Sequence, residues 1–536
     1  MQTDALAVLA NSTIADLRDA LATIVGTDHV QDDHDALALV SEDIWEKAPH
    51  LAALIAAPGS LEELRAVVAA AAEARVAIAP RGAGMSYTGG YLPANDRTLS
   101  LDMRRMNRVL RISPEDMVVT VEAGCSWSDL RKALAPHGLR TPFWGPFSGL
   151  YSTVGGGLSQ QNAMFGAARY GTTSESVVAL TIVTGDGRIL KTGARGADGN
   201  NPFYRHYGPD LAGLFCGDSG TLGVKAEITL RLIRTPAFED YATFSFKSGA
   251  QMLRAMAEIS RAELASEMCA FDPGLTKVRL QRQSLLSDVK TLGAVIGKQK
   301  NLGKGLLSAA KIAFGGRNFI EDEEYPLHVM TEGRSKEGVA ADMAAIRAIA
   351  TAEDGAEVEN TIAKVMRAQP FPEPNSILGP KGEQWGSVHG HASLSAAPAM
   401  FEEIEAMFAT RKADFEAHGV HYGYLFTSLS TNAITVEPVF YWPDAYRPVH
   451  ASMIEPAHLA RLPRIPPNPE ATAVVASARN AVKDIAARYG CAHFQVARTY
   501  PYRESRDGAS RGLLDAVKAE LDPHGILNPG ALGFPA

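Results

Sequence analysis

The feature that most constrains this chain is a glycine-rich stretch at residues 80–90, which directly follows an apolar run at residues 76–79. The apolar run predicts a short buried strand. Four glycines in the stretch would let the backbone lie against an anion, with successive N–H groups pointing inward as a phosphate nest. The last position of the G-x-G-x-x-G fingerprint lacks its glycine, and no alternating strand–helix unit follows, which argues against a Rossmann site. A glycine-rich surface turn is the alternative.

Further motifs follow the glycine stretch in a fixed order along the chain. They occupy residues 101–103, 106–109, 121–124, 128–130, 153–157, 170–172, 217–224 and 522–530. In this order they resemble the FAD-binding domain of the vanillyl-alcohol oxidase and para-cresol methylhydroxylase superfamily (the PCMH type). The resemblance covers roughly residues 24–234 and 490–530.

This resemblance implies an α+β flavoprotein of two domains, and 536 residues are too many for one core. We expect the PCMH-type FAD-binding domain at residues 1–235 and a substrate (cap) domain at residues 236–466. In the family, the cap domain covers the flavin ring with an antiparallel sheet. Residues 467–536 are expected to return to the FAD domain.

Hydrophobic periodicity and capping patterns place the expected elements. Helices are predicted at residues 12–24, 60–71, 129–134, 250–263, 339–352, 399–418 and 471–487. Strands are predicted at residues 51–57, 76–79, 118–121, 177–183, 189–190, 228–233 and 433–440.

The composition is that of a soluble globular enzyme, with 46% hydrophobic and 21% charged residues. A net charge of -8 argues against a nucleic-acid partner. The four cysteines are scattered without C-x-x-C spacing, which predicts reduced thiols in the cytoplasm and neither a disulfide framework nor a zinc site. No signal peptide and no apolar run of 18 residues is visible, so a cytoplasmic protein is expected, and a homodimer is left open.

FAD contacts are assigned by matching the family's motifs to this sequence. Three glycines at residues 155–157 would let the backbone approach the ligand, and the amides of Gln160 and Asn162 could bond a heterocycle; a flexible hinge is the alternative. Met85 and Asn432 stand where relatives attach the flavin covalently, so noncovalent FAD is predicted. The expected cofactor-binding residues are Pro80, Arg81, Gly82, Ala83, Gly84, Met85, Ser86, Pro146, Thr153, Gly156, Gly157, Gln160, Asn162, Gly220, Gly223, Val224 and Asn528.

The resemblance also implies how a substrate would be held while the flavin takes its hydride. Tyr87 and Arg498 match the family's phenolate-binding tyrosine and arginine, and a guanidinium suits a phenolate or a carboxylate. Ala497 replaces the family's second tyrosine, so Tyr500 is the substitute. The family's catalytic aspartate is missing from residues 144–149. Packing for Tyr87 and a surface ion pair for Arg498 are the structural alternatives.

Histidines supply the remaining candidates for a base. His389, His391 and His493 titrate near neutrality in ordinary surroundings, and the H-x-H spacing also suits a metal, although a lone histidine is commonly structural. The D-lactate dehydrogenase and glycolate oxidase branch of the superfamily binds a divalent metal through paired histidines and a glutamate. These are absent from residues 425–438 and 492–494, so no metal is predicted.

The sequence therefore predicts an FAD-dependent oxidase or dehydrogenase that oxidises a small-molecule CH–OH or benzylic donor, with a phenolic or aryl alcohol as the leading substrate. A D-2-hydroxy acid is the alternative substrate, and a flavin-binding protein without turnover is the alternative class. Oxygen, a quinone or a cytochrome would reoxidise the flavin. Residues 290–317 mix basic and apolar side chains without an acidic residue, which suits a peripheral membrane contact or a solvated insertion.

Overall fold

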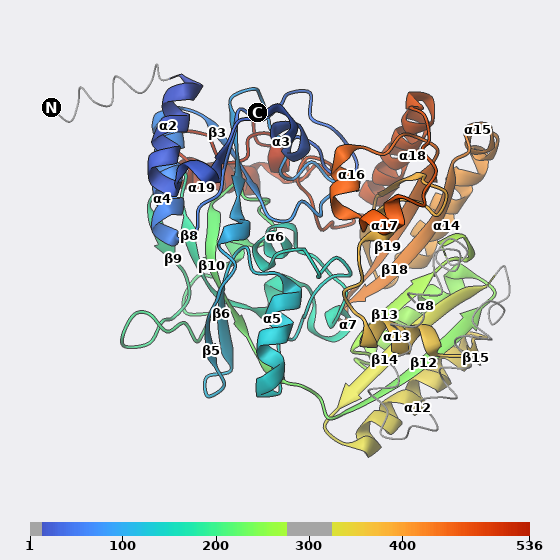
Figure 1. Ribbon diagram of the computed structural model, residues 1–536. Coiled ribbons are helices and arrows are strands. Elements are labelled where there is room, and N and C mark those ends of the chain that lie inside the picture. The colour runs from blue at the N-terminus through green and yellow to red at the C-terminus, as the bar shows by residue number, and fades with distance from the viewer. Residues whose placement is uncertain (1–12, 276–323) are drawn as a thin grey trace. The chain divides into compact units, whose positions relative to one another are not determined.

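A computed structural model of the chain describes residues 13–275 and 324–536. The chain folds as two compact units, and each is formed by separate stretches of sequence (Figure 1). The first unit comprises Met1–Asn162, Thr172–Arg234 and Phe494–Ala536, and the second comprises Ala163–Gly171 and Thr235–His493. The expected membrane contact at residues 290–317 lies outside the described residues. Within the described ranges, none of the helices combines the length and the apolar character that crossing a bilayer requires.

The first unit opens with a small sheet that delivers the glycine stretch. Its strands are β1 (Val30–Gln31), β2 (Leu54–Ala56), β4 (Thr98–Asp102) and β3 (Ala77–Arg81), in that spatial order. β2 and β3 both run parallel to β4. The helices α2 (Ile14–Val25) and α4 (Leu61–Glu73) lie side by side next to this sheet (Figure 1). Ser60 caps α4 by accepting a hydrogen bond from the backbone N–H of Glu63 at 3.1 Å.

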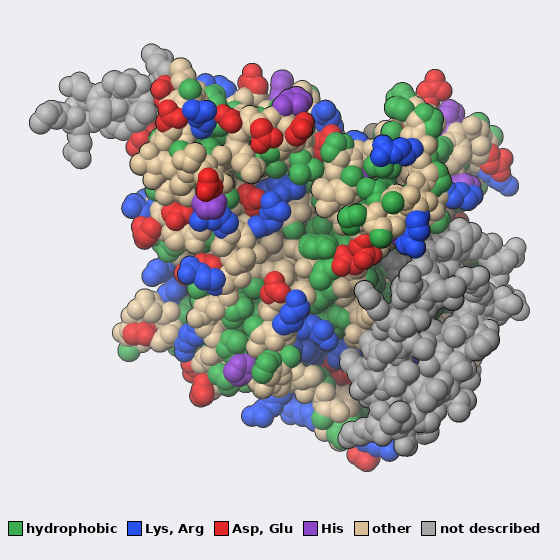
Figure 2. Space-filling view, in the orientation of Figure 1, with side chains coloured by type: hydrophobic (Ala, Val, Ile, Leu, Met, Phe, Trp, Pro, Cys, Tyr) green, Lys and Arg blue, Asp and Glu red, His purple; other side chains and the backbone are tan. Residues whose placement is uncertain are grey.

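A second, antiparallel sheet completes the first unit. Its strands are β5 (Val109–Ser113), β6 (Val118–Glu122), β10 (Val224–Arg231), β8 (Val177–Val183) and β9 (Ile189–Lys191), in that order. All seven residues of β8 are buried, as expected for a central strand. The remaining elements of this unit are α3 (His34–Val40), α5 (Trp127–Leu134), α6 (Val154–Gln160), α19 (Gly508–Leu521), β7 (Leu139–Arg140) and β11 (Ile233–Arg234). Over the face of this unit seen in Figure 2, basic and acidic side chains are interspersed.

The second unit is built on an eight-stranded sheet, order β15-β12-β14-β13-β18-β19-β16, in which β17 also pairs with β19. All of its pairings are antiparallel. The strands are β12 (Phe238–Phe246), β13 (Glu267–Phe271), β14 (Tyr325–Gly333), β15 (Ala356–Val358), β16 (Gln384–Ser387), β17 (Gly390–Ser393), β18 (His421–Leu429) and β19 (Ala433–Trp442). The helices are α7 (Ala167–Tyr170), α8 (Gly249–Arg261), α12 (Lys336–Ala352), α13 (Thr361–Ala368), α14 (Ala397–Thr410), α15 (Lys412–Ala417), α16 (Pro448–Met453), α17 (Pro456–Leu459) and α18 (Pro469–Arg488).

Packing of aromatic side chains explains why α14 lies on this sheet. Phe401 and Phe408 of α14 are buried, and their rings contact Tyr424, Phe426 and Phe440 of β18 and β19. Aromatic pairs of this kind add about 0.5–1.5 kcal/mol each beyond the burial of their area.

Three elements differ from the expectation. The helix predicted at residues 399–418 is broken at Arg411 into α14 and α15. Residues 153–166, read as a small-residue stretch or hinge, contain the helix α6. Helix α18 belongs to the second unit, so the segment that returns to the first unit begins at Phe494 instead of residue 467.

Candidate functional site

The glycine stretch leaves β3 as a loop, residues 82–90, whose backbone needs glycine at defined points. Gly84 and Gly89 have φ of 75° and 73°, in the left-handed region that favours glycine. A Cβ at Gly82 would lie 2.5 Å from Oγ1 of Thr153, the residue that caps α6. The phenolic O–H of Tyr91 donates to the carbonyl of Gly84 at 2.8 Å. The loop therefore has one defined conformation, packed closely against the start of α6.

Segments distant in the sequence converge on this loop within the first unit. The side-chain amide of Asn528 donates to the carbonyls of Gly90, at 2.8 Å, and Ser219, at 2.6 Å. The N–H of Gln495 donates to the carbonyl of Gln160 at 2.7 Å. One side chain thus ties the closing segment of the chain to the glycine loop and to the loop before β10.

Arg81 is a buried cation at the start of this site. Its side chain is 5% exposed and lies over the ring of Tyr91, 5.2 Å from the ring centroid. The side chain of Arg81 makes no hydrogen bond or ion pair in the described ranges. Nε of Arg81, Oε1 of Gln160 and Oγ of Ser219 are buried there without a hydrogen-bond partner. Buried polar groups are normally satisfied, and a buried charge normally has a partner. Nε of Arg81 and the hydroxyl of Ser219 can donate to an anion such as a phosphate of FAD, whereas Oε1 of Gln160 needs a hydrogen-bond donor from the ligand.

Two lysine–aspartate pairs stiffen the loop at residues 217–224. Lys225 donates to Asp218 at 2.5 Å, with both side chains almost completely buried. Lys518 of α19 donates to the carboxylate of Asp522 at 2.7 Å and to the carbonyl of Thr221 at 2.8 Å. Burial lowers the pKa of Lys518, while the carboxylate of Asp522 opposes that shift. The sequence reasoning missed these pairs, although Lys518 and Asp522 stand four residues apart just before the closing motif.

The three glycines at the start of α6 are explained by packing as much as by ligand access. A Cβ at Gly155 would lie 2.7 Å from Cβ of Ala123, and one at Gly157 would lie 2.9 Å from Nε1 of Trp127. Gly156 meets only Oγ1 of Thr153, which accepts its N–H at 3.1 Å. Of the three, Gly156 is the least constrained, because a Cβ there would meet Oγ1 of Thr153 alone, at 3.0 Å.

Arg498 is held by the glycine loop and the closing segment. Its guanidinium donates to the carbonyl of Gly89, to Oδ1 of Asn528 at 2.9 Å and to the carbonyl of Pro529 at 2.7 Å. Burial lowers its pKa to about 10 against the opposing effect of nearby carboxylates. Tyr87 and Tyr500, 8% and 3% exposed, are buried in the same unit. These hydrogen bonds show that Arg498 holds the glycine loop to the closing segment. Its expected role as an anchor for a substrate anion stays a prediction.

The other expected cofactor residues also lie in the first unit. Pro80 packs against Gly220, where a Cβ would lie 3.1 Å from Cγ of Pro80. The hydroxyl of Ser86 lies 3.3 Å from Oε1 of Gln495. Ala83 and Met85 lie in the glycine loop, and Val224, preceded by Gly223, is the first residue of β10. The carbonyl of Pro146 accepts the N–H of Gly149, and the side chain of Asn162 accepts the hydroxyl of Thr173.

The three candidate histidines gather in the second unit. The rings of His389 and His391 are stacked with centroids 5.4 Å apart, and the ring of His493 lies 5.9 Å from that of His389. Nδ1 of His493 lies 2.8 Å from the carbonyl oxygen of His389, and Nδ1 of His391 lies 2.9 Å from the hydroxyl of Thr435. Burial lowers the pKa of His391 to about 3 and that of His493 to about 4. Both rings are therefore uncharged at neutral pH.

The tautomer of His493 follows from its partner. A carbonyl oxygen only accepts hydrogen bonds, so Nδ1 of His493 carries the proton and Nε2 presents a lone pair. No group of three or more metal-ligating side chains with a suitable arrangement occurs in the part of the chain that the structure describes.

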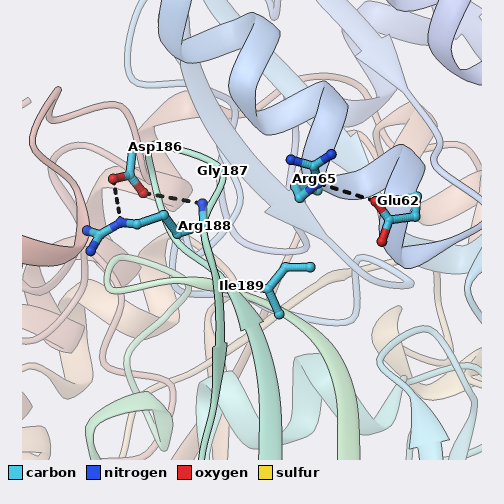
Figure 3. Close-up of a pocket in the computed structure, with 6 residues that line it drawn as sticks. All are labelled: Glu62, Arg65, Asp186, Gly187, Arg188 and Ile189. Atoms are coloured by element: carbon cyan, nitrogen blue, oxygen red, sulfur yellow. Dashed lines mark hydrogen bonds and ion pairs between the residues drawn. The ribbon is translucent and has the colours of Figure 1, made fainter.

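A surface groove between α4 and the turn after β8 is a separate feature (Figure 3). Its charged side chains pair among themselves: Arg65 lies 3.3 Å from Glu62, and Arg188 lies 2.6 Å from Asp186. Since these are exposed surface pairs, the groove offers no buried unsatisfied group like those around Arg81.

Comparisons with known proteins match both ends of the first unit. Residues 52–193 match the model of the FAD binding domain, and residues 496–532 match that of the C-terminal domain of FAD linked oxidases. The chain is 33% identical over 195 residues to "D-lactate dehydrogenase [cytochrome] 1, mitochondrial" of Saccharomyces cerevisiae, covering 36% of this chain and 32% of the relative. It is 29% identical over 221 residues to the glycolate oxidase subunit GlcD of Bacillus subtilis, covering 41% and 45%. The matches thus span less than half of the length of these relatives.

Solved structures share the fold over nearly the whole chain. p-Cresol methylhydroxylase with substrate bound aligns with a TM-score of 0.72 at 17% identity, covering 97% of both chains. An alkyldihydroxyacetonephosphate synthase aligns with a TM-score of 0.68 at 19% identity, covering 97% of this chain and 85% of the other. At these identities the likeness concerns the fold alone.

Proposed function

We propose that this chain is an FAD-dependent oxidoreductase acting on a CH–OH or benzylic donor, because it matches the FAD binding domain and the C-terminal domain of FAD linked oxidases and shares the fold of p-cresol methylhydroxylase. The observation that carries this proposal is the buried side chain of Arg81 beside the glycine loop, whose Nε has no hydrogen-bond partner within the described residues. Bound FAD would supply a flavin that accepts the donor's hydride. The protein's part is to hold the cofactor, orient the donor and manage the donor's proton.

Within this proposal, Arg81 and N–H groups of the loop at residues 82–90 other than that of Gly89, which is bound by Asp43, hold the phosphates. Gln160 and Ser219 present buried polar atoms that would bond other edges of FAD. Lys518 and Asn528 keep the loops on either side in place and are positioning residues.

His493 is the proposed acceptor of the donor's hydroxyl proton. Its Nε2 carries a lone pair because Nδ1 donates to His389, and its lowered pKa keeps it uncharged at neutral pH. His391, stacked on His389 and bonded to Thr435, would fix the surroundings of that ring.

The donor proposed first is a phenolic or aryl alcohol, with Tyr87, Tyr500 and Arg498 as its binding residues. Arg498 already donates hydrogen bonds to three protein acceptors, which weighs against a strong interaction of its guanidinium with a substrate anion. A D-2-hydroxy acid is the second candidate, favoured by the sequence likeness to proteins called D-lactate dehydrogenase and glycolate oxidase subunit.

Anaerobic bleaching of the flavin spectrum tests the proposal. The purified holoprotein is mixed with aryl alcohols, alkylphenols and D-2-hydroxy acids, and one class should bleach the absorbance near 450 nm on the order of seconds or faster. His493→Gln should slow bleaching by about 10²-fold or more without changing the FAD content, because it removes a proton acceptor. The matched control is His418→Gln, since His418 directly follows α15 and is not one of the candidate histidines. Bound FAD that no donor class bleaches would identify a non-catalytic flavin-binding protein and overturn the proposal.

A further inference from the structure

A turn outside the matched FAD domain binds the glycine loop. This turn, residues 41–46, follows α3, and its carboxylate at Asp43 is fully buried. One oxygen of Asp43 accepts the N–H of Gly89 at 2.7 Å. The other oxygen accepts the N–H groups of Trp45, at 2.8 Å, and Glu46, at 2.7 Å. The N–H of Ile44 donates to the carbonyl of Ser86 at 3.2 Å, so the turn is attached to the loop at two points.

Arg498 holds the same glycine from its other end. Its guanidinium donates to the carbonyl of Gly89, and its own N–H donates to the carbonyl of Thr88 at 3.1 Å. Gly89 cannot be replaced without strain, because its φ is 73° and a Cβ would lie 3.0 Å from Oε1 of Glu46. The N–H of one loop residue is therefore bound by a carboxylate and its C=O by a guanidinium.

We propose that Asp43 and Arg498 are positioning residues that clamp Gly89 from both sides and thereby set the affinity of the glycine loop for FAD. The inference rests on the proposed function in that FAD is taken as the ligand of the loop. It goes beyond the matched domain, since Asp43 lies outside residues 52–193. Hydrogen bonds to charged groups are about twice as strong as neutral ones, and these are shielded from water, so the clamp resists opening of the loop.

The clamp has a built-in dependence on pH. Burial raises the pKa of Asp43 to about 6, against the lowering effect of its backbone hydrogen bonds, and the charged groups that face it are Glu46 and Arg498. Both carboxylate oxygens accept N–H groups, so protonation removes the negative charge that strengthens these hydrogen bonds. The affinity for FAD should consequently fall as the pH drops through about 6.

The experiment compares Asp43→Asn with Asp272→Asn. Asp272 is a matched control in the second unit: its carboxylate also accepts three backbone N–H groups, from Gly274, Leu275 and Tyr424, and burial also raises its pKa to about 6. Apoprotein of each variant is titrated with FAD between pH 5 and 8 while the flavin fluorescence is recorded. Asp43→Asn should raise the Kd by about tenfold or more at pH 7.5 and flatten its pH dependence, whereas Asp272→Asn should leave both unchanged.

Hydrogen exchange of the apoprotein supplies a second measurement that needs no cofactor. Asp43→Asn and Arg498→Met should each speed amide exchange in residues 82–90, and Asp272→Asn should not. The clamp would be overturned if the Asp43→Asn variant exchanged the amides of residues 82–90 at the wild-type rate, or if it bound FAD as tightly as the wild type. A wild-type apoprotein that binds no FAD would instead overturn the cofactor assignment, and bound FAD that no donor bleaches would overturn only the proposed reaction.

Discussion

Replacing Arg81 should have opposite effects on cofactor binding and on the stability of the apoprotein. The change is Arg81→Met, which keeps an unbranched side chain beside Tyr91 but removes the guanidinium and its charge. In the apoprotein Arg81 is 5% exposed and no anion in the described ranges faces it. Its buried charge therefore lowers the stability of the apoprotein until FAD binds.

The magnitudes follow from the burial of that charge. A hydrogen bond to a charged group contributes about 1.5–3 kcal/mol, so losing one or two of them to a phosphate should weaken FAD binding by roughly 3 kcal/mol. At about 1.4 kcal/mol per tenfold change, the Kd should rise by about 10²-fold. Burying an unpaired charge costs several kcal/mol, and the cation–π contact with Tyr91 offsets about 0.5–2 kcal/mol of that cost. Because the variant lacks this charge, its apoprotein should unfold at a higher urea concentration than the wild-type apoprotein.

Two measurements on the same preparation check both signs. FAD affinity is obtained from fluorescence titration of the apoprotein, and the free energy of unfolding from urea denaturation monitored by circular dichroism. Arg104→Met, at an exposed arginine that pairs with Asp102 at the end of β4, is the control and should change neither quantity by more than about 1 kcal/mol. A variant at Arg81 that binds FAD like the wild type, or that loses stability as apoprotein, would refute the reasoning.

Three further outcomes are expected. FAD should be released intact by acid precipitation because it is held noncovalently; flavin fluorescence that migrates with the denatured polypeptide would contradict this. Lys518→Met should lower the free energy of unfolding by about 3–5 kcal/mol, since it leaves the buried carboxylate of Asp522 unpaired, and a urea midpoint close to that of the wild type would show that the pair is dispensable. Because the pKa values of His391 and His493 are lowered from 6.5 to about 3 and about 4, the unfolded chain binds more protons below pH 6.5, and stability should fall as the pH drops from 6.5 towards 4. Substituting both histidines with glutamine should reduce that fall, and equal losses in wild type and variant would rule the explanation out.

Local signals were enough to predict the elements that surround the cofactor loop. The pair Ser60 and Glu63 marks the start of α4, and the apolar residues 76–79 mark β3, because caps and short buried strands depend on neighbours in the sequence. The small residues 153–157 misled, because three glycines lower the helix propensity and the close packing of Gly155 and Gly157 depends on neighbours distant in the sequence. Packing against Ala123 and Trp127 overrides the low helix propensity there.

Long-range partners explain what the sequence could not reveal about the site. Arg498 was recognisable as a residue of interest from its motif, but its acceptors on Gly89 and Pro529 come from segments that only the fold brings together. Asp43 belongs to no recognisable motif, and its hydrogen bond to Gly89, 46 residues later in the sequence, is visible only in the fold. The lone pair on Nε2 of His493 likewise follows from a carbonyl 104 residues earlier in the chain.

The position of the closing segment has a consequence for how the protein is made. Ile78 of β3 donates to the carbonyl of Ile526 and accepts the N–H of Asn528, and the side chain of Asn528 bonds to Gly90 across 438 residues of sequence. Synthesis adds about 5–20 residues per second, so the glycine loop exists for tens of seconds on the ribosome before its last partner is translated. The residues from Thr235 to His493 belong to the other compact unit and can fold during that interval. The cofactor loop is therefore expected to close only after residues 526–528 have been translated, so a polypeptide that lacks them would have an open cofactor site.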